Sequence, residues 1–266
     1  MPGRQSGDCN VLTPAYFDSA ACLNCGATLT GPFCAACGQR RATRLGVSTV
    51  RTEAWSRLRL FDSALVRSLW LLVRQPGGYA RVYVLGQRAG VMQPLALLLV
   101  LIGLLVVLLG YTQYLAPPSD NEVLVRMFAL VREYSKWSFS LGIVAIYLAA
   151  WLMFRGHLGY NATELLVLAA CAHTLCLVLQ LVNQLPLLVW NEAAHLLWHK
   201  RWTPYPVGAL QAMVVWLAMR QFFCVQGRAG HARLMVAALL YLGAKWGVQQ
   251  VYARAVVEVV HWQMGL

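Results

Sequence analysis

The chain has 266 residues, of which 59% are hydrophobic and only 12% are charged, and its mean hydropathy is +0.55. Soluble globular proteins carry about 25% charged residues, and a soluble fold could not hide so much apolar surface behind so few charges. The composition excludes an ordinary cytosolic enzyme, a disordered protein and a secreted disulfide scaffold. It predicts a membrane protein. In such a protein the net charge of +12 is expected to set the orientation in the membrane and to contact anionic lipid headgroups, rather than to bind nucleic acid.

A cysteine module at residues 21–39 follows a flexible tail at residues 1–20 and is the first element expected in the chain. It contains Cys-x2-Cys-Gly twice, with ligands expected at Cys22, Cys25, Cys34 and Cys37. Each such turn brings two thiolates together, and two turns make a tetrahedral four-thiolate site typical of structural zinc. The segment is too small for a core of its own, so we expect a zinc ribbon rather than two redox pairs.

The remaining cysteines are expected to play no part in this site. Cys9 lies in the tail, whereas Cys171, Cys176 and Cys224 lie in apolar stretches. Cysteine in such stretches behaves as a small hydrophobe, and we expect these three to be buried in that role. Residues 1–21 show no signal peptide, and a reducing cytosol suits a zinc ribbon.

Residues 40–93 are expected to form a cytosolic, amphipathic juxtamembrane segment. A helix over residues 50–75 would place Leu58, Phe61, Leu65, Leu69 and Leu72 on one face. That face would lie in the membrane interface or pack on the chain's own helices, and both alternatives stay open. The helix would stop at residues 75–78, Gln-Pro-Gly-Gly, before a short mixed segment at 79–93.

Three arginines in and around this segment recur every seven residues, at Arg74, Arg81 and Arg88. Residues 74–94 would form a rigid hinge next to the membrane, with Pro94 in the first turn of the following helix. Guanidinium groups form bidentate hydrogen bonds with phosphate, which the ammonium group of lysine cannot do. The three arginines are therefore candidates for contact with anionic lipid phosphates, or they serve only as a positively charged anchor.

Residues 94–266 are expected to form an all-α transmembrane domain of about five helices. The apolar runs cover residues 94–115, 137–154, 165–190, 207–225 and 234–251, and residues 255–266 either continue the fifth helix or form an interfacial tail. With the N-terminus inside, the inner side would hold fifteen basic residues and the outer side six. This asymmetry predicts a cytoplasmic N-terminus, and an odd number of spans puts the C-terminus on the other side of the membrane.

Two stretches of the chain resemble a bacterial family, the domain-of-unknown-function family numbered three-six-six-seven. One stretch is Cys-Leu-Asn-Cys-Gly to Cys-Ala-Ala-Cys-Gly-Gln at residues 22–39. The other is Arg-Gln-Pro-Gly at 74–77 followed by Tyr-Val-Leu-Gly-Gln-Arg at 83–88 and Pro94. The resemblance covers roughly residues 20–115 and implies an N-terminal zinc ribbon joined to a multi-span membrane domain. It also implies a bacterial inner membrane, in which the N-terminus would be cytoplasmic and the C-terminus periplasmic. The family has no assigned activity, so the resemblance implies no function.

Ionisable residues within membrane spans are candidates for function. Lys245 and His173 would lie at similar depth in the fifth and third spans and could form a proton or ligand site. The alternative is that Lys245 only reaches the interface or neighbouring carbonyl groups. In the outer loop, Glu192, His195 and His199 would share a helical face and offer a second, weaker metal-site hypothesis.

The sequence supports three hypotheses about function. The first is a non-enzymatic membrane protein whose cytosolic zinc ribbon binds a protein partner. The second is a transporter or channel lined by Lys245, His173, Gln180 and Gln211. The third is a membrane enzyme acting on a lipid or lipid-linked substrate through the arginine-rich interface. No catalytic motif favours the third hypothesis. The sequence therefore leaves open whether the chain is an enzyme, and it favours a non-enzymatic role.

Overall fold

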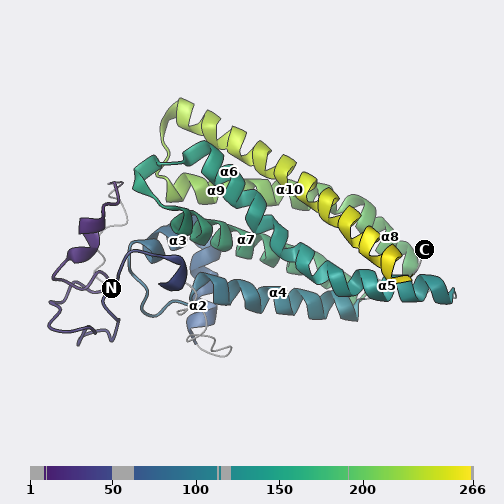
Figure 1. The fold of residues 1–266 in the computed structure, drawn as a ribbon, viewed down its shortest axis with the longest axis horizontal. Coiled ribbons are helices and arrows are strands. Elements are labelled where there is room, and N and C mark those ends of the chain that lie inside the picture. The colour runs from purple at the N-terminus through teal and green to yellow at the C-terminus, as the bar shows by residue number, and fades with distance from the viewer. Residues whose placement is uncertain are drawn as a thin grey trace.

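The structure is a computed structural model that describes residues 9, 11–49, 63–112, 114, 121–190 and 192–264. It is an elongated bundle of helices with a small module, made mostly of turns and loops with one short helix, at the end where the N-terminus lies (Figure 1). Within the described residues the only β-structure is a pair of isolated bridges, Ala21 to Thr28 and Phe33 to Arg40, both inside that module. The predicted all-α architecture with a separate cysteine module is thus present.

The helices of the described residues run in the following order. They are η1 (Pro14–Asp18), α2 (Ser63–Arg74), α3 (Pro76–Val84), α4 (Pro94–Tyr111), α5 (Glu122–Ser135), η2 (Lys136–Ser140), α6 (Leu141–Phe154), η3 (His157–Gly159), α7 (Ala162–Gln184), η4 (Leu185–Leu188), α8 (Ala193–Trp202), α9 (Pro204–Phe222) and α10 (Gly227–Met264).

Each of the five predicted spans overlaps one of the helices α4, α6, α7, α9 and α10, but five membrane spans are not confirmed. Two helical stretches, Pro94–Tyr111 and Ala162–Leu188, are long and apolar enough to cross a membrane, and Ser138–Phe154 is a shorter apolar helix. The fifth helix differs most from expectation, because α10 continues through 38 residues. At 1.5 Å per residue it is about 57 Å long, so the C-terminal residues extend the helix rather than forming a separate tail.

Local signals explain where two of the long helices begin. Gln93 precedes Pro94 and its side chain accepts a hydrogen bond from the backbone N–H of Ala96 at 2.8 Å. Asn161 and Glu164 form a capping box at the start of α7, with each side chain accepting a hydrogen bond from the other residue's backbone N–H. These caps satisfy N–H groups that the first helical turn leaves without a partner.

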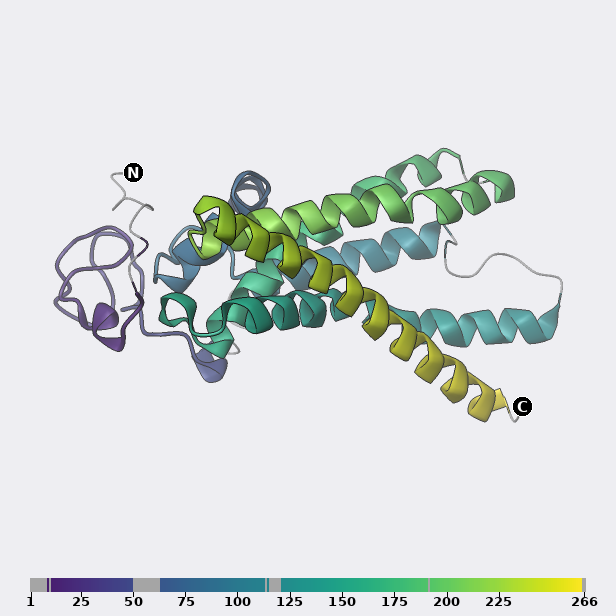
Figure 2. The ribbon, with the colours of Figure 1, turned by 90° about the horizontal axis from the view of Figure 1, so that it is seen from above.

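Helix α7 lies at the centre of the bundle. It packs against α3, α4, α6 and α9, and α10 packs against α6 and α9. Figure 2 shows α10 as the long helix that crosses the bundle obliquely. Small side chains on α7 and α9, among them Ala169, Ala172 and Ala218, are fully buried and allow this close packing.

Helix α3 replaces the short mixed segment expected after the turn at residues 75–78. The turn does end α2, but Pro76 then starts a second helix that is largely buried against α7 and α9. A Cβ placed on Gly77 would lie 1.9 Å from the carbonyl oxygen of Ala218, so only glycine permits this approach. The backbone N–H groups of Gly77 and Gly78 donate to Oε1 of Gln221, at 3.0 and 3.2 Å.

The described part of the predicted amphipathic helix is α2. Leu72 is fully buried, and Leu65 and Leu69 pack against the same core, so this face is turned to the bundle rather than to a membrane interface. Trp70 and Val66 on the same helix are exposed. Residues 50–62, which include Leu58 and Phe61, lie outside the described residues.

Candidate functional site

The four cysteines of the predicted ribbon converge in two matching turns. The Sγ atoms of Cys22, Cys25, Cys34 and Cys37 all lie within 4.8 Å of one another. In each turn the glycine that follows the second cysteine has a positive φ, +81° at Gly26 and +70° at Gly38. Its N–H donates to the carbonyl oxygen of the first cysteine at 2.8 Å. The glycines therefore provide a left-handed conformation that other residues adopt at a cost.

The sulfur positions fit one tetrahedral metal ion. Cys22 and Cys37 are 3.7 Å apart between sulfurs, and Cys25 and Cys34 are 3.5 Å apart. Four sulfurs bound at 2.3 Å to one tetrahedral ion are separated by about 3.8 Å. The cluster could thus hold a metal, and Cys9 is not part of it.

Gln39 attaches the ribbon to the loop that follows α3. Its Nε2 donates to the carbonyl oxygen of Gly86 at 2.7 Å, and its Oε1 accepts from the backbone N–H groups of Arg88 and Ala89, both at 2.8 Å. Gly86 has a φ of +92°, and a Cβ there would lie 2.9 Å from side-chain atoms of Leu23 and Ala42. The ribbon therefore contacts the chain's own helical domain, a contact that local sequence patterns did not predict.

The structure separates the three arginines expected to contact lipid phosphates. Arg74, at the end of α2, stacks over the exposed Trp70 ring at 4.2 Å. Arg81 is buried and donates to Sγ of Cys224. Arg88 is also buried, and it donates to the carbonyl oxygens of Tyr83 and Thr43. The seven-residue repeat spans two helices and a loop, so it does not create one face, and only Arg74 retains the geometry expected of a lipid contact.

Cys9 and Cys224 form a disulfide that joins the N-terminal tail to the end of α9. The expectation that Cys224 is a small buried hydrophobe is therefore wrong, whereas Cys171 and Cys176 are buried as expected. Cys224 also has a φ of +52°, which is uncommon for a residue other than glycine. The local sequence around Cys224 could not indicate its partner, because Cys9 lies 215 residues away in the chain.

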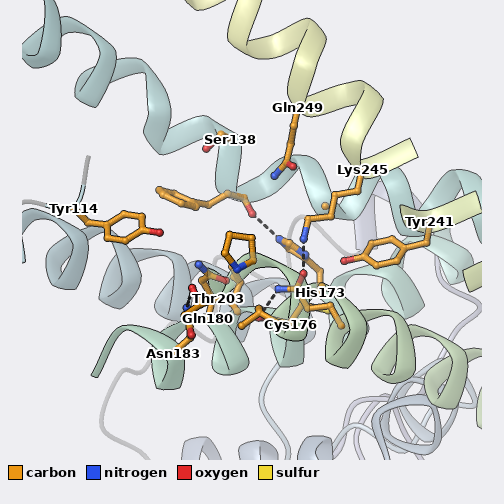
Figure 3. A pocket seen from close by; sticks show the side chains of 17 residues that line it. Tyr114, Ser138, His173, Cys176, Gln180, Asn183, Thr203, Tyr241, Lys245 and Gln249 are labelled. Atoms are coloured by element: carbon orange, nitrogen blue, oxygen red, sulfur yellow. Dashed lines mark hydrogen bonds between the residues drawn. The ribbon is translucent and has the colours of Figure 1, made fainter. Parts of the chain in front are cut away.

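A polar cavity of about 240 Å³ lies between α6, α7, α9 and α10. His173, Cys176 and Gln180 line it from α7, Gln211 lines it from α9, and Tyr241 and Lys245 line it from α10. Figure 3 shows these side chains together with Ser138, Asn183, Thr203 and Gln249 around the same space. The four residues proposed from sequence as a channel lining, Lys245, His173, Gln180 and Gln211, thus all border one cavity.

Lys245 is held by a short chain of hydrogen bonds in this cavity. Its Nζ donates to Oε1 of Gln211. The amide Nε2 of Gln211 in turn donates to the carbonyl oxygen of Cys176 at 3.3 Å, which fixes the orientation of the Gln211 amide (Figure 3). Lys245 is half-buried and Gln211 is buried, so the lysine reaches from α10 to the wall formed by α9.

His173 faces the same cavity with one nitrogen already engaged. Its Nε2 lies 2.5 Å from the carbonyl oxygen of Phe139. Because a carbonyl oxygen only accepts, this nitrogen carries the hydrogen. The other nitrogen, Nδ1, has no hydrogen-bond partner among the described residues. The ring packs so closely on Gly142 that a Cβ there would lie 2.4 Å from it.

The second metal hypothesis, at Glu192, His195 and His199, does not assemble as a cluster. His195 and Glu192 approach to 3.6 Å, but His199 is buried and its Nε2 contacts the carbonyl oxygen of Asn183 at 2.8 Å. His199 instead joins the start of α9 to the end of α7. Within the described residues, the four ribbon cysteines are the one group of metal-binding side chains found close together.

Residues 62–106 match the sequence model of a family described as a protein of unknown function (DUF3667). The match covers α2, α3 and most of α4, and it confirms the family resemblance predicted from residues 74–94. The ribbon lies outside the matched residues, so its part in the resemblance is supported by the cysteine cluster alone. No curated protein and no solved structure matches the chain.

Proposed function

We propose that the chain is an integral membrane protein whose helical domain binds a small polar solute, as a transporter or channel does. The observation that carries this proposal is the polar cavity bordered by Lys245, His173 and Gln211. Solute sites in helical membrane proteins lie between helices, and ionisable residues inside the bundle mark them. A domain that needed only to anchor a ribbon would be expected to fill this space with apolar side chains.

The outward surface of the helices supports a membrane setting. On α4, Leu99 and Leu104 are about half exposed and Val107 is 72% exposed. A groove between α6 and α10 is lined by Leu148, Leu152, Val236 and Leu239 and by similarly apolar neighbours. Soluble monomers rarely expose apolar patches of this extent, whereas lipid chains cover them at no cost.

The distribution of basic residues supports a cytoplasmic ribbon. Arg155 caps the end of α6, and Arg228 and Arg233 lie in the first two turns of α10. Figure 1 shows that the end of α6 and the start of α10 lie toward the ribbon. The cavity, by contrast, is lined by Tyr114, Ser138 and Thr203 from the opposite ends of the helices. With the ribbon in the cytoplasm of a bacterium, the cavity would face the periplasm.

The proposed role of the ribbon is structural, with zinc bound by its four cysteines. Zinc suits four thiolates and performs no redox chemistry, and four protein ligands leave no open position for a reactive water. Gln39 and Arg44, which follow the last cysteine, both bond to the helical domain. A folded ribbon would therefore fix the cytoplasmic end of α3 and α7.

Cavity size limits the solute. The cavity has a volume of about 240 Å³. Drug-sized ligands occupy pockets of about 300 to 1,000 Å³. The solute is therefore a small molecule or ion rather than a sugar chain or a lipid.

Glycine 208 allows a direct test of solute binding. It lines the cavity on α9, and a Cβ added there meets nothing within 4 Å, so Gly208→Leu can start a bulky side chain at the cavity wall, which should take up space that a solute would need. Gly103→Leu is the matched control, because Gly103 also has open space but lies exposed on α4. Thermal unfolding of the full chain in lipid nanodiscs would be measured with acetate, lactate, glycine, urea or phosphate.

We expect at least one of these solutes to raise the Tm of the parent chain and of Gly103→Leu, but not that of Gly208→Leu. A solute at ten times its Kd stabilises the folded state by about 1.4 kcal/mol, which corresponds to a rise of about 3 °C. Equal shifts in Gly208→Leu, or no shift in the parent chain, would rule out binding in this cavity.

A second candidate function, binding of a protein partner by the ribbon, is favoured by one observation. Phe33, between the two cysteine pairs, is 61% exposed, and exposed aromatic side chains are frequent anchors of protein interfaces. A photoreactive amino acid at position 33 would report a cross-linked partner in cells. Cross-linking that survives in a chain with all four ribbon cysteines replaced by serine would argue against a folded ribbon surface.

A further inference from the structure

We propose that the cavity selects anions, and that its ligand is a small anion such as a carboxylate, bound by the ammonium group of Lys245. This inference rests on the proposed solute-binding function and adds the charge of the solute. It is supported by the charge balance of the lining, by the way in which Lys245 is held, and by the neutral hydrogen-bonding groups around it.

The charge balance of the lining is positive. Among the residues that the structure describes, seventeen border the cavity, and none of these is an aspartate or a glutamate. Within the described residues, Nζ of Lys245 donates to the neutral amide of Gln211 and lies 5.9 Å from the centroid of the neutral Tyr241 ring. Lysine removed from bulk water is normally paired with a negative charge, because burial of an unpaired charge is costly. Here the ligand would supply that negative charge.

The hydrogen bonds of Gln211 leave the ammonium ready for a ligand. An ammonium group has three N–H donors, and Gln211 accepts one of them. The contact between Gln211 and the carbonyl oxygen of Cys176 holds the amide in place. The Lys245 side chain is therefore positioned before the ligand arrives, which reduces the entropy lost on binding.

Neutral polar groups around the ammonium suit an oxyanion. Gln180 and Gln249 line the cavity, and the side-chain amide of each can donate hydrogen bonds (Figure 3). An oxyanion accepts several hydrogen bonds at once, whereas a cation would require carbonyl or carboxylate oxygens and would be repelled by Lys245. A neutral solute would leave the lysine charge uncompensated. Among the three classes of solute, an anion fits the lining best.

The test compares two thiol reagents of opposite charge at one position in the cavity. Gln180→Cys, made together with Cys176→Ala, places one reactive thiol in the lining. The full chain in nanodiscs would react with 2-sulfonatoethyl methanethiosulfonate, an anion, or with the trimethylammonioethyl analogue, a cation. Mass spectrometry of the peptide that contains residue 180 measures each rate. The anion-to-cation ratio is then divided by the same ratio for free 2-mercaptoethanol, which removes the intrinsic difference between the reagents.

We expect the normalised ratio to be at least about tenfold in favour of the anion, because one unit charge within several ångströms has an effect of this order in a partly buried site. Adding Lys245→Gln should return the ratio to about one, whereas Lys245→Arg should retain the preference. The Arg variant separates loss of charge from loss of structure.

The remaining outcomes are each decisive. Equal rates for both reagents, unchanged by Lys245→Gln, would overturn the anion inference while leaving an accessible cavity and the proposed function intact. Failure of either reagent to react at residue 180, with the exposed control Val47→Cys fully labelled in the same sample, would overturn the proposed function as well.

Discussion

Arg44 and Glu164 lie 120 positions apart in the chain, yet Nε of the arginine is 3.0 Å from Oε1 of the glutamate. A second guanidinium nitrogen is 3.2 Å from Oε2 and also donates to the carbonyl oxygen of Gly159 at 2.6 Å. Glu164 is fully buried and caps the first turn of α7 as well. This ion pair therefore joins the segment after the ribbon to the helix that carries His173.

We predict that Arg44→Ala destabilises the chain by about 2 to 3 kcal/mol, because it leaves the Glu164 carboxylate buried without its partner. Thermal unfolding in nanodiscs would measure the loss. Arg40→Ala, at an exposed site nearby, should change stability by less than about 0.5 kcal/mol. Equal effects of the two substitutions would show that the ion pair contributes nothing specific.

Metal content is the second prediction. The purified chain should contain one zinc ion, and Cys22→Ser should lose it because a buried ligand of the four is removed. Cys9→Ser should keep the metal, since Cys9 lies outside the cluster. Elemental analysis of the three proteins decides the matter. Less than half an equivalent in the parent chain, or iron in place of zinc, would contradict the assignment.

Gly77 provides a third prediction about the packing of α3 on α9. Gly77→Ala would bring a methyl group to 1.9 Å from the carbonyl oxygen of Ala218, so the two helices must separate. We expect a loss of several kcal/mol, or failure to fold, as for other overpacked sites. Gly103→Ala, with open space around it, should be neutral or slightly stabilising. Similar expression and Tm for both variants would contradict the observed helix contact.

The Cys9–Cys224 pair provides a fourth prediction, on compartment. Disulfides persist in oxidising compartments and are rare in the cytosol. If the ribbon faces the cytoplasm as proposed, both thiols should be free in living cells and should pair only after cell lysis in air. Rapid alkylation of intact cells followed by mass spectrometry would measure this. A disulfide already present in cells would contradict the cytoplasmic placement of this end.

The apolar runs predicted all five long helices because each run is continuous and its ends carry local signals such as Pro94 and the Asn161 capping box. The four-cysteine cluster was predicted for the same reason, since its geometry is encoded within sixteen residues. The sequence also placed Lys245 and His173 at similar depth, because helix rise converts sequence position into depth. These features depend on local spacing alone.

Features that depend on contacts between distant segments were not predicted. The bonds from Gln39 to residues 86–89 and from Arg44 to Glu164 join segments 47 to 120 positions apart. The burial of Arg88 follows from the position of the ribbon, which no spacing rule supplies. Helix α3 was not predicted because Pro-Gly-Gly is typical of a turn. Its first turn is stabilised by contacts with Gln221 and Ala218, which are distant in the sequence.

The central claim is that a membrane domain contains a polar cavity that opens on the side away from the ribbon. The most direct test is to measure from which side of the membrane residue 180 is labelled. Gln180→Cys would be exposed to the membrane-impermeant sulfonate reagent in intact spheroplasts and in inverted membrane vesicles, with Val47→Cys as the marker for the ribbon side. We predict that residue 180 reacts only in spheroplasts and residue 47 only in inverted vesicles. Labelling of both positions from the same side, or of residue 180 from neither, would contradict the account.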